Sequence, residues 1–256
     1  MKNLVIGVSP ESSLKLLGSF ADIIMLDKDP LPKIMPSYDT LYLRSHFAQP
    51  ETLPQNFRLE IEDLVQRAKL ENPSLKFVDG MDNVDALLAF EDKWQQYKTF
   101  RDLMPMTKLF NDRSVSAFQR PVFKKRLSSR GTGVTWDLEK VSGPFDDWLA
   151  QESLDIMQEL RVYVICGEVY SIGVVRQSKT AHQKTQAVDF RALTKDEIEF
   201  SSQVSRRAPG LDFIGLDVAR TADGMLYLME VNRSPGFAAF DRLTSVNLGA
   251  ILYEKL

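Results

Sequence analysis

Short apolar runs alternate with amphipathic stretches over the first 90 residues of the chain. Four of the runs have the length and composition of buried strands, and two of the stretches between them have helical spacing. The predicted strands cover residues 4–8, 23–26, 41–43 and 77–78, and the predicted helices cover residues 9–20 and 57–70. This alternation predicts a small α/β unit with a largely parallel sheet.

A longer helix is predicted over residues 84–103, where apolar side chains recur at helical spacing. Asn83 is placed to cap its first turn, and Met104-Pro105 ends it. The apolar stripe consists of Leu87, Leu88, Trp94, Tyr97 and Phe100. The pattern therefore predicts one continuous helix between the N-terminal unit and the rest of the chain.

Beyond Pro105 the pattern changes to pairs of strands joined by short turns. Residues 160–166 are predicted to pair with 169–175 through a turn near Gly167, and residues 213–219 with 225–231 through Asp223-Gly224. The polar stretch 177–191 has no periodicity and is predicted to be a mobile loop. Residues 245–256 are predicted to form a closing helix.

Composition excludes several classes of protein. The chain has 256 residues, 44% of them hydrophobic, which is enough for a sizeable core. A net charge of −3 gives no global sign of nucleic-acid binding. Cys166 is the single cysteine, which excludes an internal disulfide and a cysteine zinc site. No apolar run is long enough for a signal peptide or a membrane span, so we expect a soluble cytoplasmic protein.

Three oxygen-bearing side chains are predicted to meet on the hairpin of residues 213–231. Glu230 and Asn232 are two apart and share a strand face. If Asp223-Gly224 is a two-residue turn, Asp217 falls opposite Glu230, and Gly215 falls opposite Asn232 and leaves room beside it. Two carboxylates and an amide suit a hard cation such as Mg²⁺ that bridges nucleotide phosphates.

The opposite face of this hairpin is predicted to pack on a core. It would consist of Met225, Tyr227, Met229 and Val231. The alternative for the acidic face is an ordinary surface hairpin whose acids point to solvent. We favour the metal site, because uncompensated acids between apolar strands are costly.

A candidate phosphate site lies between the two regions. Lys124 ends a predicted strand and can act as a point charge on the α- and β-phosphates. Small residues and glycines follow it and allow backbone N–H groups to approach an anion. The candidate loop residues are Ser128, Ser129, Arg130 and Gly131, with Arg126 adding charge. The loop is not a Walker A motif, and a solvated basic hairpin remains the alternative.

The hairpin of residues 160–175 carries two arginines on one face. With a turn at Cys166-Gly167 or at Gly167-Glu168, Arg161 and Arg176 share a sheet face. Near a phosphate site they would stabilise a transferring phosphoryl group as catalytic residues. The alternative is a cross-strand ion pair with Glu159.

Taken together, these motifs resemble the ATP-grasp superfamily, and within it the RimK-type branch of carboxylate–amine ligases. The resemblance extends from about Asn83 to the C-terminus. Its most specific motif is Glu230-Val231-Asn232-Arg233-Ser234-Pro235-Gly236, which is similar to the family's Glu-Val-Asn-x-Ser-Pro-Gly. The other matching segments are Asp92-Lys93, Pro105-x-Thr107, Val122-Phe123-Lys124 with Gly131-x-Gly133, residues 148–154, and Glu159-Leu160-Arg161.

The resemblance implies an α/β (α+β) ATP-grasp fold in three parts. These are an N-terminal α/β pre-ATP-grasp domain at 1–90, a small lid subdomain at 91–153 and a C-terminal antiparallel-sheet subdomain at 154–256. It implies that Lys93 contacts ATP, that the backbone of a hinge strand contacts adenine, and that Glu159 contacts the ribose. The hinge residues are Gln151, Glu152, Ser153 and Leu154. It also suggests substrate contacts from Lys184, Arg233 and Ser234.

The activity that the resemblance implies is ATP- and Mg²⁺-dependent amide or peptide bond formation through an acyl-phosphate, with Mn²⁺ as an alternative metal. The substrates would be ATP, a carboxylate and an amine on a small molecule or peptide, for example an amino acid added to a peptide or protein. An ATP-grasp phosphotransferase and a nucleotide-responsive binding protein without turnover are the alternatives. A homo-oligomer stays open. Arg44, Ser45 and His46 follow a predicted strand and could contact substrate or lie on a loop surface.

Overall fold

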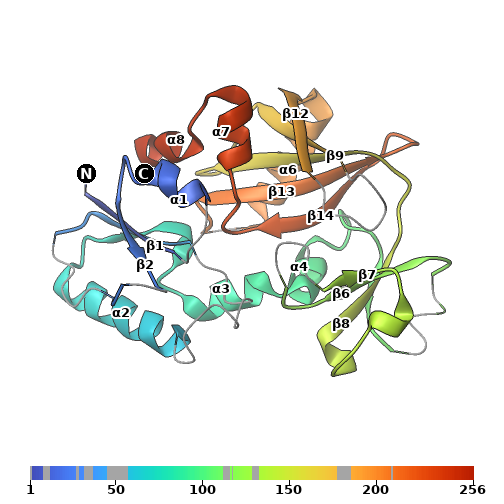
Figure 1. The fold of residues 1–256 in the computed structure, drawn as a ribbon, viewed down its shortest axis with the longest axis horizontal. Helices are drawn as coiled ribbons and strands as arrows, with labels where there is room; N and C mark the ends of the chain where they lie inside the picture. The colour runs from blue at the N-terminus through green and yellow to red at the C-terminus, as the bar shows by residue number, and fades with distance from the viewer. Residues whose placement is uncertain are drawn as a thin grey trace.

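Three β-sheets follow one another along the chain in a computed structural model (Figure 1). The structure describes residues 2–7, 12–26, 29–31, 37–44, 57–111, 116, 118–128, 133–177, 186–208 and 210–256. The three sheets fall inside the segments 1–90, 91–153 and 154–256 expected from the sequence, and the domain boundaries themselves stay a prediction. The mixed α/β architecture is confirmed.

The N-terminal sheet has four parallel strands in the order β2-β1-β3-β4, as predicted. Its strands are β1 (Asn3–Gly7), β2 (Asp22–Met25), β3 (Thr40–Arg44) and β4 (Lys76–Phe77), with helices α1 (Ser12–Leu17) and α2 (Phe57–Glu71). Leu4 and Ile6 pack toward α2, whereas Val5 and Tyr42 pack toward the C-terminal part of the chain. Burial on both faces explains why these strands are continuous apolar runs.

The predicted helix over residues 84–103 is two helices, so that prediction is wrong in part. A short 3₁₀ turn, η2 (Val78–Gly80), precedes α3 (Val84–Glu91), and α4 (Lys93–Phe100) follows. Asn83 caps α3 as expected, accepting a hydrogen bond from the backbone N–H of Ala86. Asp92 is extended, with ψ 114°, and caps α4 by accepting from the N–H of Trp94. An aspartate that caps a helix competes with helix continuation, which explains the break.

The second sheet is small and antiparallel, with the order β5-β8-β6-β7. It consists of β5 (Thr107–Leu109), β6 (Pro121–Lys125), β7 (Val134–Thr135) and β8 (Trp148–Glu152), with the 3₁₀ turns η3 (Leu138–Lys140) and η4 (Phe145–Asp147). Among the described residues, Phe110, Phe123, Trp148 and Ala150 form its small buried core cluster. In Figure 1 this sheet lies at the opposite end of the molecule from the N-terminal sheet.

The third sheet is antiparallel, with the order β12-β11-β9-β13-β14 and β10 paired to β9. Its strands are β9 (Ile156–Ile165), β10 (Glu168–Val169), β11 (Ile172–Gln177), β12 (Gln186–Ala192), β13 (Phe213–Thr221) and β14 (Leu226–Asn232). Helix α6 (Lys195–Arg206) packs on one face together with α4, and α7 (Ala238–Thr244) and α8 (Leu248–Lys255) pack on the other. The closing helix is confirmed as α8.

Strand β12 corrects the prediction of a mobile loop over residues 177–191. Residues 186–192 pair with β11, and the pairing contains a bulge between Val175 and Arg176. Val188 and Phe190 are exposed on this edge strand, so its side chains do not alternate cleanly between apolar and polar. The sequence signal for a strand is lost for that reason. Residues 178–185 of the predicted loop lie outside the described part of the chain.

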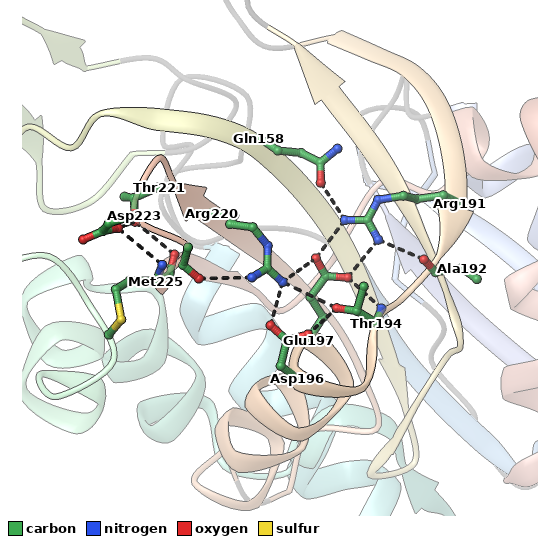
Figure 2. A network of polar contacts seen from close by, with 11 residues as sticks. Gln158, Arg191, Ala192, Thr194, Asp196, Glu197, Arg220, Thr221, Asp223 and Met225 are labelled. Carbon is green, nitrogen blue, oxygen red and sulfur yellow. Dashed lines mark hydrogen bonds and ion pairs between the residues drawn. The ribbon is translucent and has the colours of Figure 1, made fainter.

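An ionic network around a buried carboxylate joins α6 to strands β9, β12 and β13 of the third sheet (Figure 2). The fully buried carboxylate of Glu197 accepts hydrogen bonds from Arg191 at 2.7 and 2.8 Å and from Arg220 at 3.1 Å. It also accepts from the backbone N–H of Thr194, which completes a capping box at the start of α6. Burial alone would raise the pKa of Glu197, but the donated hydrogen bonds hold it at about 2. Arg191, expected in a mobile loop, is thus committed to this network.

Among the helices in the described ranges, none combines the length and apolarity needed to cross a bilayer.

Candidate active site

The three predicted metal ligands lie together on the β13–β14 hairpin. Asp217 is paired with Glu230 and Gly215 with Asn232, which confirms the predicted register at this end of the hairpin. The Nδ2 atom of Asn232 lies 3.4 Å from Oδ2 of Asp217. Directly paired residues and residues two apart share a sheet face, so the three polar groups converge.

The turn of this hairpin differs from the prediction. Thr221 and Met225 close a loop of three residues, and Gly224 takes φ +87°. Beyond the loop, Val218 pairs with Leu228, so Met229 is an unpaired bulge residue. Because of the bulge, the β14 residues between the loop and Met229 point to the opposite sheet face from the one predicted. The core residues are therefore Leu226, Leu228 and Val231; the predicted inward orientation of Met225, which is 56% exposed, is wrong.

Asp217 is held by both arginines that the sequence placed on one face. Arg161 donates from Nε and Nη2 to the two carboxylate oxygens at 2.5 and 3.0 Å, and Nη1 of Arg176 donates at 2.7 Å. Burial acts to raise the pKa of Asp217, but the two guanidinium groups outweigh it and hold that pKa below its usual range. Asp217 is therefore an ionised carboxylate in a buried, cation-rich setting.

Arg176 also pairs with Glu159, at 2.9 Å. The two residues are directly opposite on β11 and β9, so the cross-strand ion pair considered from the sequence is present. The β9–β10 turn is Cys166-Gly167, with φ values of +49° and +82°, which is the two-residue type I′ geometry. Burial, and next the charge of Asp217, raise the pKa of Glu159. The arginines thus both face the site and belong to an ion-pair network.

Lys93, the first residue of α4, connects the candidate metal ligands to the start of the glycine loop. Its Nζ lies 3.2 Å from Oε1 of Glu230. The same Nζ donates to two atoms of Ser128, the backbone carbonyl oxygen and, at 3.3 Å, Oγ. The break at Asp92 makes this contact possible, because it ends one helix and restarts another with Lys93 at its N-terminus. Ser128 is the only predicted loop contact among the described residues; Ser129, Arg130 and Gly131 lie outside them.

Arg126 does not add free positive charge to the loop as expected. Its Nη2 donates to Oδ2 of Asp92 at 2.5 Å, and its backbone carbonyl accepts from the N–H of Lys93 at 3.1 Å. Arg126 and Asp92 therefore join β6 to the start of α4. Asp92 belongs to a segment that resembles a family motif, but its pairing with Arg126 is not predictable from the sequence, since no spacing rule relates residues 34 apart on different elements.

Lys124, on β6, faces the same cluster from the second sheet. Burial lowers the pKa of its ammonium group, the positive charge of Lys93 acts in the same direction, and the carboxylates of Glu230, Glu159 and Asp217 oppose the change. The site thus combines four cations, Lys93, Lys124, Arg161 and Arg176, with three carboxylates. A surplus of positive charge before any metal is added suits a polyanionic ligand.

The hinge residues lie at the end of β8, where the second sheet leads into the third. Gln151 is buried, and its Nε2 donates to Oγ1 of Thr107 at 2.9 Å. The backbone N–H of Glu152 is paired with the carbonyl of Met106. Beyond this pairing the chain leaves the sheet, and a groove is lined by Phe118, Gln119, Arg120, Glu152, Ser153, Leu154 and Asp155. Ser153 and Leu154 thus line a groove beside the hinge, and the expected backbone contact with adenine stays a prediction.

The residues suggested for substrate contact have different surroundings. Arg233 is 1% exposed, and its guanidinium donates to Glu91 at 2.7 Å and to the carbonyl of Leu43 at 2.9 Å. This burial gives Arg233 a structural position and argues against direct substrate contact. Ser234 is 8% exposed, and within the described chain its buried Oγ has no hydrogen-bond partner. Lys184 lies outside the described residues.

The amide of Asn232 is the third oxygen donor of the candidate metal site. Within the described ranges no group of three or more His, Cys, Asp or Glu side chains is arranged to hold a metal. Asp217 and Glu230 supply two carboxylates, and Asn232 supplies a third, neutral oxygen beside them. This donor set fits a hard cation that keeps water or phosphate oxygens as further ligands.

Comparison with known proteins defines the class. The family model described as ATP-grasp domain, R2K clade family 3, matches residues 61–235. The chain belongs to this family and is an ATP-dependent ligase of the ATP-grasp class. No curated protein sequence matches it.

Solved structures share the fold over nearly the whole chain. The ATP-grasp ligase PsnB complexed with minimal precursor has 18% identity and a TM-score of 0.68, with 99% of each chain covered. The macrocyclase MdnC from Microcystis aeruginosa MRC, bound with precursor peptide MdnA, has 17% identity and a TM-score of 0.68, with 100% of each chain covered. D-alanyl-alanine synthetase A from Vibrio cholerae has 13% identity and a TM-score of 0.65, with 98% of this chain and 96% of that chain covered.

Proposed function

We propose that the chain joins a carboxylate to an amine by way of an acyl-phosphate, and that one of the two substrates is a peptide. The observation that carries this proposal is the single cluster in which Lys93, Lys124, Arg161 and Arg176 surround Asp217 and Glu230. A cluster of this kind can neutralise a triphosphate and a metal-bound phosphoryl group together. The peptide is supported by the relatives PsnB and MdnC, which were solved with precursor peptides.

In this proposal each side chain has a distinct role. Lys93 and Lys124 contact the phosphates of ATP, and Glu159 contacts the ribose. Asp217, Glu230 and Asn232 hold Mg²⁺, which when bound would neutralise the phosphate oxygens; a PsnB complex containing Mg and ADP supports this choice of metal. Within the described chain, Nη1 of Arg161 and Nη2 of Arg176 donate no hydrogen bond and are the atoms we assign to the transferring phosphoryl group.

The chemistry has two balanced steps. A carboxylate oxygen attacks the γ-phosphorus of ATP, the bond from that phosphorus to the β–γ bridging oxygen breaks, and ADP leaves with its electron pair. The amine nitrogen then attacks the acyl carbon, phosphate departs, and the nitrogen loses a proton. The arginines stabilise the charge on the phosphoryl oxygens in both steps, and exclusion of water protects the acyl-phosphate between them.

The test is a substrate screen that measures phosphate and ADP and identifies the products by mass spectrometry. A ligase releases phosphate when both a carboxylate and an amine are present, and its product is the two substrates less one water. A phosphorylated product that persists when amine is added would identify a phosphotransferase instead. ATP turnover at background with every peptide and amino acid in the screen would indicate a binding protein without turnover.

A further inference from the structure

The end of β3 and the turn after β14 are joined by a reciprocal exchange of arginines. Nη2 of Arg44 donates to the backbone carbonyl of Pro235 at 2.8 Å, and Nη1 of Arg233 donates to the backbone carbonyl of Leu43 at 2.9 Å. Each segment thus places a guanidinium group on the other's main chain. Both arginines are buried, at 3% and 1% exposure, so these are low-dielectric, charge-assisted hydrogen bonds.

Residues 233–237, here called the ligand turn, are fixed at further points. The hydroxyl of Tyr163 donates to the carbonyl of Gly236 at 2.9 Å, and Oγ of Ser13 accepts from the backbone N–H of Phe237 at 2.9 Å. Arg44 also lies over the ring of Phe237, with its Cζ 5.4 Å from the centroid. The N-terminal unit, through Arg44 at the end of β3 and Ser13 on α1, therefore holds a segment that begins directly after Asn232.

A chain of contacts leads from the ligand turn into the candidate metal site. A Cβ placed on Gly215 would lie 2.6 Å from Cβ of Pro235 and 3.1 Å from Cδ of Arg161. The space predicted beside Asn232 is thus filled by the ring of Pro235 and by Arg161, which holds Asp217. A shift of Pro235 would therefore disturb Gly215, which pairs with Asn232 and also lies against Arg161, the residue that holds Asp217.

We infer that Arg44 is a positioning residue for the candidate metal site: it holds the carbonyl of Pro235, and thereby Asn232 and Asp217, in the geometry that binds Mg²⁺-nucleotide. This inference rests on the proposed function. It assigns Arg44 no contact with ATP or with the metal, and it differs from a substrate contact because the guanidinium is buried against the protein itself. Groups that hydrogen-bond metal ligands directly typically change metal affinity by about 10–100-fold when removed. Arg44 acts one contact further from the metal ligands, so we expect the lower end of this range.

The experiment compares ADP binding with and without Mg²⁺ by calorimetry. Arg44→Gln removes the charge and should weaken binding of ADP in the presence of Mg²⁺ by about tenfold, while binding of metal-free ADP stays unchanged. Arg44→Lys retains one donor for the Pro235 carbonyl and should fall between wild type and Arg44→Gln. The matched control is Thr40→Val on the same strand, which loses a buried hydrogen bond to Asn3 and should leave both affinities unchanged.

A merely structural role would not produce this metal-dependent difference. If Arg44→Gln binds ADP with Mg²⁺ as tightly as wild type, or loses affinity equally with and without Mg²⁺, the inference is overturned. If Arg44→Gln does not fold, the same criteria apply to Arg44→Lys. A wild-type protein that binds no ADP under either condition counts against the proposed function itself, and the two failures are thus distinguishable.

Discussion

Asp217 and Glu230 face each other across β13 and β14 because Met229 is left out of the strand pairing. The hairpin loop has one residue more than a two-residue turn, which by itself would shift the register by one. The bulge at Met229 takes up that extra residue. A shift of one position would send Glu230 to the opposite face, so the bulge is what keeps the two carboxylates together.

Glu230→Gln should abolish Mg²⁺-dependent ATP turnover, with a loss of at least about a hundredfold, because a neutral amide binds a hard cation weakly. The change is nearly isosteric, so the melting temperature should stay close to that of wild type. Steady-state phosphate release and a melting curve measure the two properties. Glu168→Gln, an exposed site on β10, is the matched control. Normal turnover in a folded Glu230→Gln protein would remove Glu230 from the site.

Lys124→Ala should weaken ATP binding by about 1–3 kcal/mol, the range for a lost charged hydrogen bond. Its neighbour Lys125 provides the control: it is exposed and lies over the ring of Trp148, 5.6 Å from the centroid, on the other side of β6. Calorimetry should therefore give a normal affinity for Lys125→Ala. Equal affinities for the two variants would show that Lys124 is not a phosphate contact.

The pH dependence of ATP binding gives a second test of Lys124. Burial lowers the pKa of its ammonium group, so the charge is lost at a lower pH than in an ordinary lysine. ATP affinity should then decline with rising pH sooner in wild type than in Lys124→Arg, whose guanidinium stays charged. Parallel pH profiles for the two proteins would contradict this expectation.

Asp79→Asn should change how stability depends on pH. Asp79 is 1% exposed, and its Oδ1 accepts from the backbone N–H groups of Asp212 and Phe213 at 2.7 and 2.8 Å. Burial raises the pKa of Asp79 from 3.8 to about 7, against the opposing effects of the Phe213 hydrogen bond and Arg233. Because the folded-state pKa is the higher one, the free energy of unfolding falls as pH rises from about 4 to about 7, by roughly 4 kcal/mol in total.

An asparagine keeps the acceptor oxygen and tolerates the left-handed backbone at this position, where φ is +60°. Urea unfolding at pH 5 and pH 8 should therefore show that Asp79→Asn is more stable than wild type at pH 8 and less different from it at pH 5. Asp82→Asn, at an exposed position nearby, should follow the wild-type profile. A wild-type stability that does not decline over this interval would be inconsistent with a buried, ionising Asp79.

Glu197→Gln should lower the free energy of unfolding by about 3 kcal/mol at pH 7, since it removes the charge that pairs with Arg191 and Arg220. The depressed pKa of Glu197 means that its contribution is present above about pH 4.5 and is lost as pH falls through about 2. Acid unfolding of the variant should therefore be less steep in that interval. Glu199→Gln, exposed on the same helix, should behave as wild type in both measurements.

Local patterns predicted the parallel N-terminal sheet, the two hairpins and the shared face of Arg161 and Arg176, because strand parity and turn chemistry are properties of neighbouring residues. The sequence does not reveal the break at Asp92, because the apolar residues before and after Asp92 keep the same helical spacing. Strand β12 was missed because Val188 is a bulge residue and the strand lies at a sheet edge.

Long-range partners could not be predicted from spacing. Nothing near Arg233 in the sequence indicates its partner Glu91, which lies 142 residues earlier. The burial of Arg233 argues against the expected substrate contact, which stays a prediction. Gln96 is a similar case: its amide both donates to the carbonyl and accepts from the N–H of Val231, at 2.9 and 3.0 Å. These two hydrogen bonds satisfy the backbone N–H and carbonyl of Val231 on the edge strand β14. A glutamine on a helix carries no sequence signal for such a role.

The hydrogen bonds of Arg44 and Arg233 between β3 and the ligand turn determine what a shortened fragment of the chain would lose. A fragment that begins at Asn83 would retain every residue assigned here to ATP and the metal, yet it would lack Arg44, Ser13 and the Leu43 carbonyl. Arg233 would lose one of its acceptors, and the apolar surface of α7 and α8, including Phe237, Phe240 and Leu248, would lose the packing of Val5 and Tyr42. We therefore expect the N-terminal unit and the rest of the chain to fold as one cooperative unit.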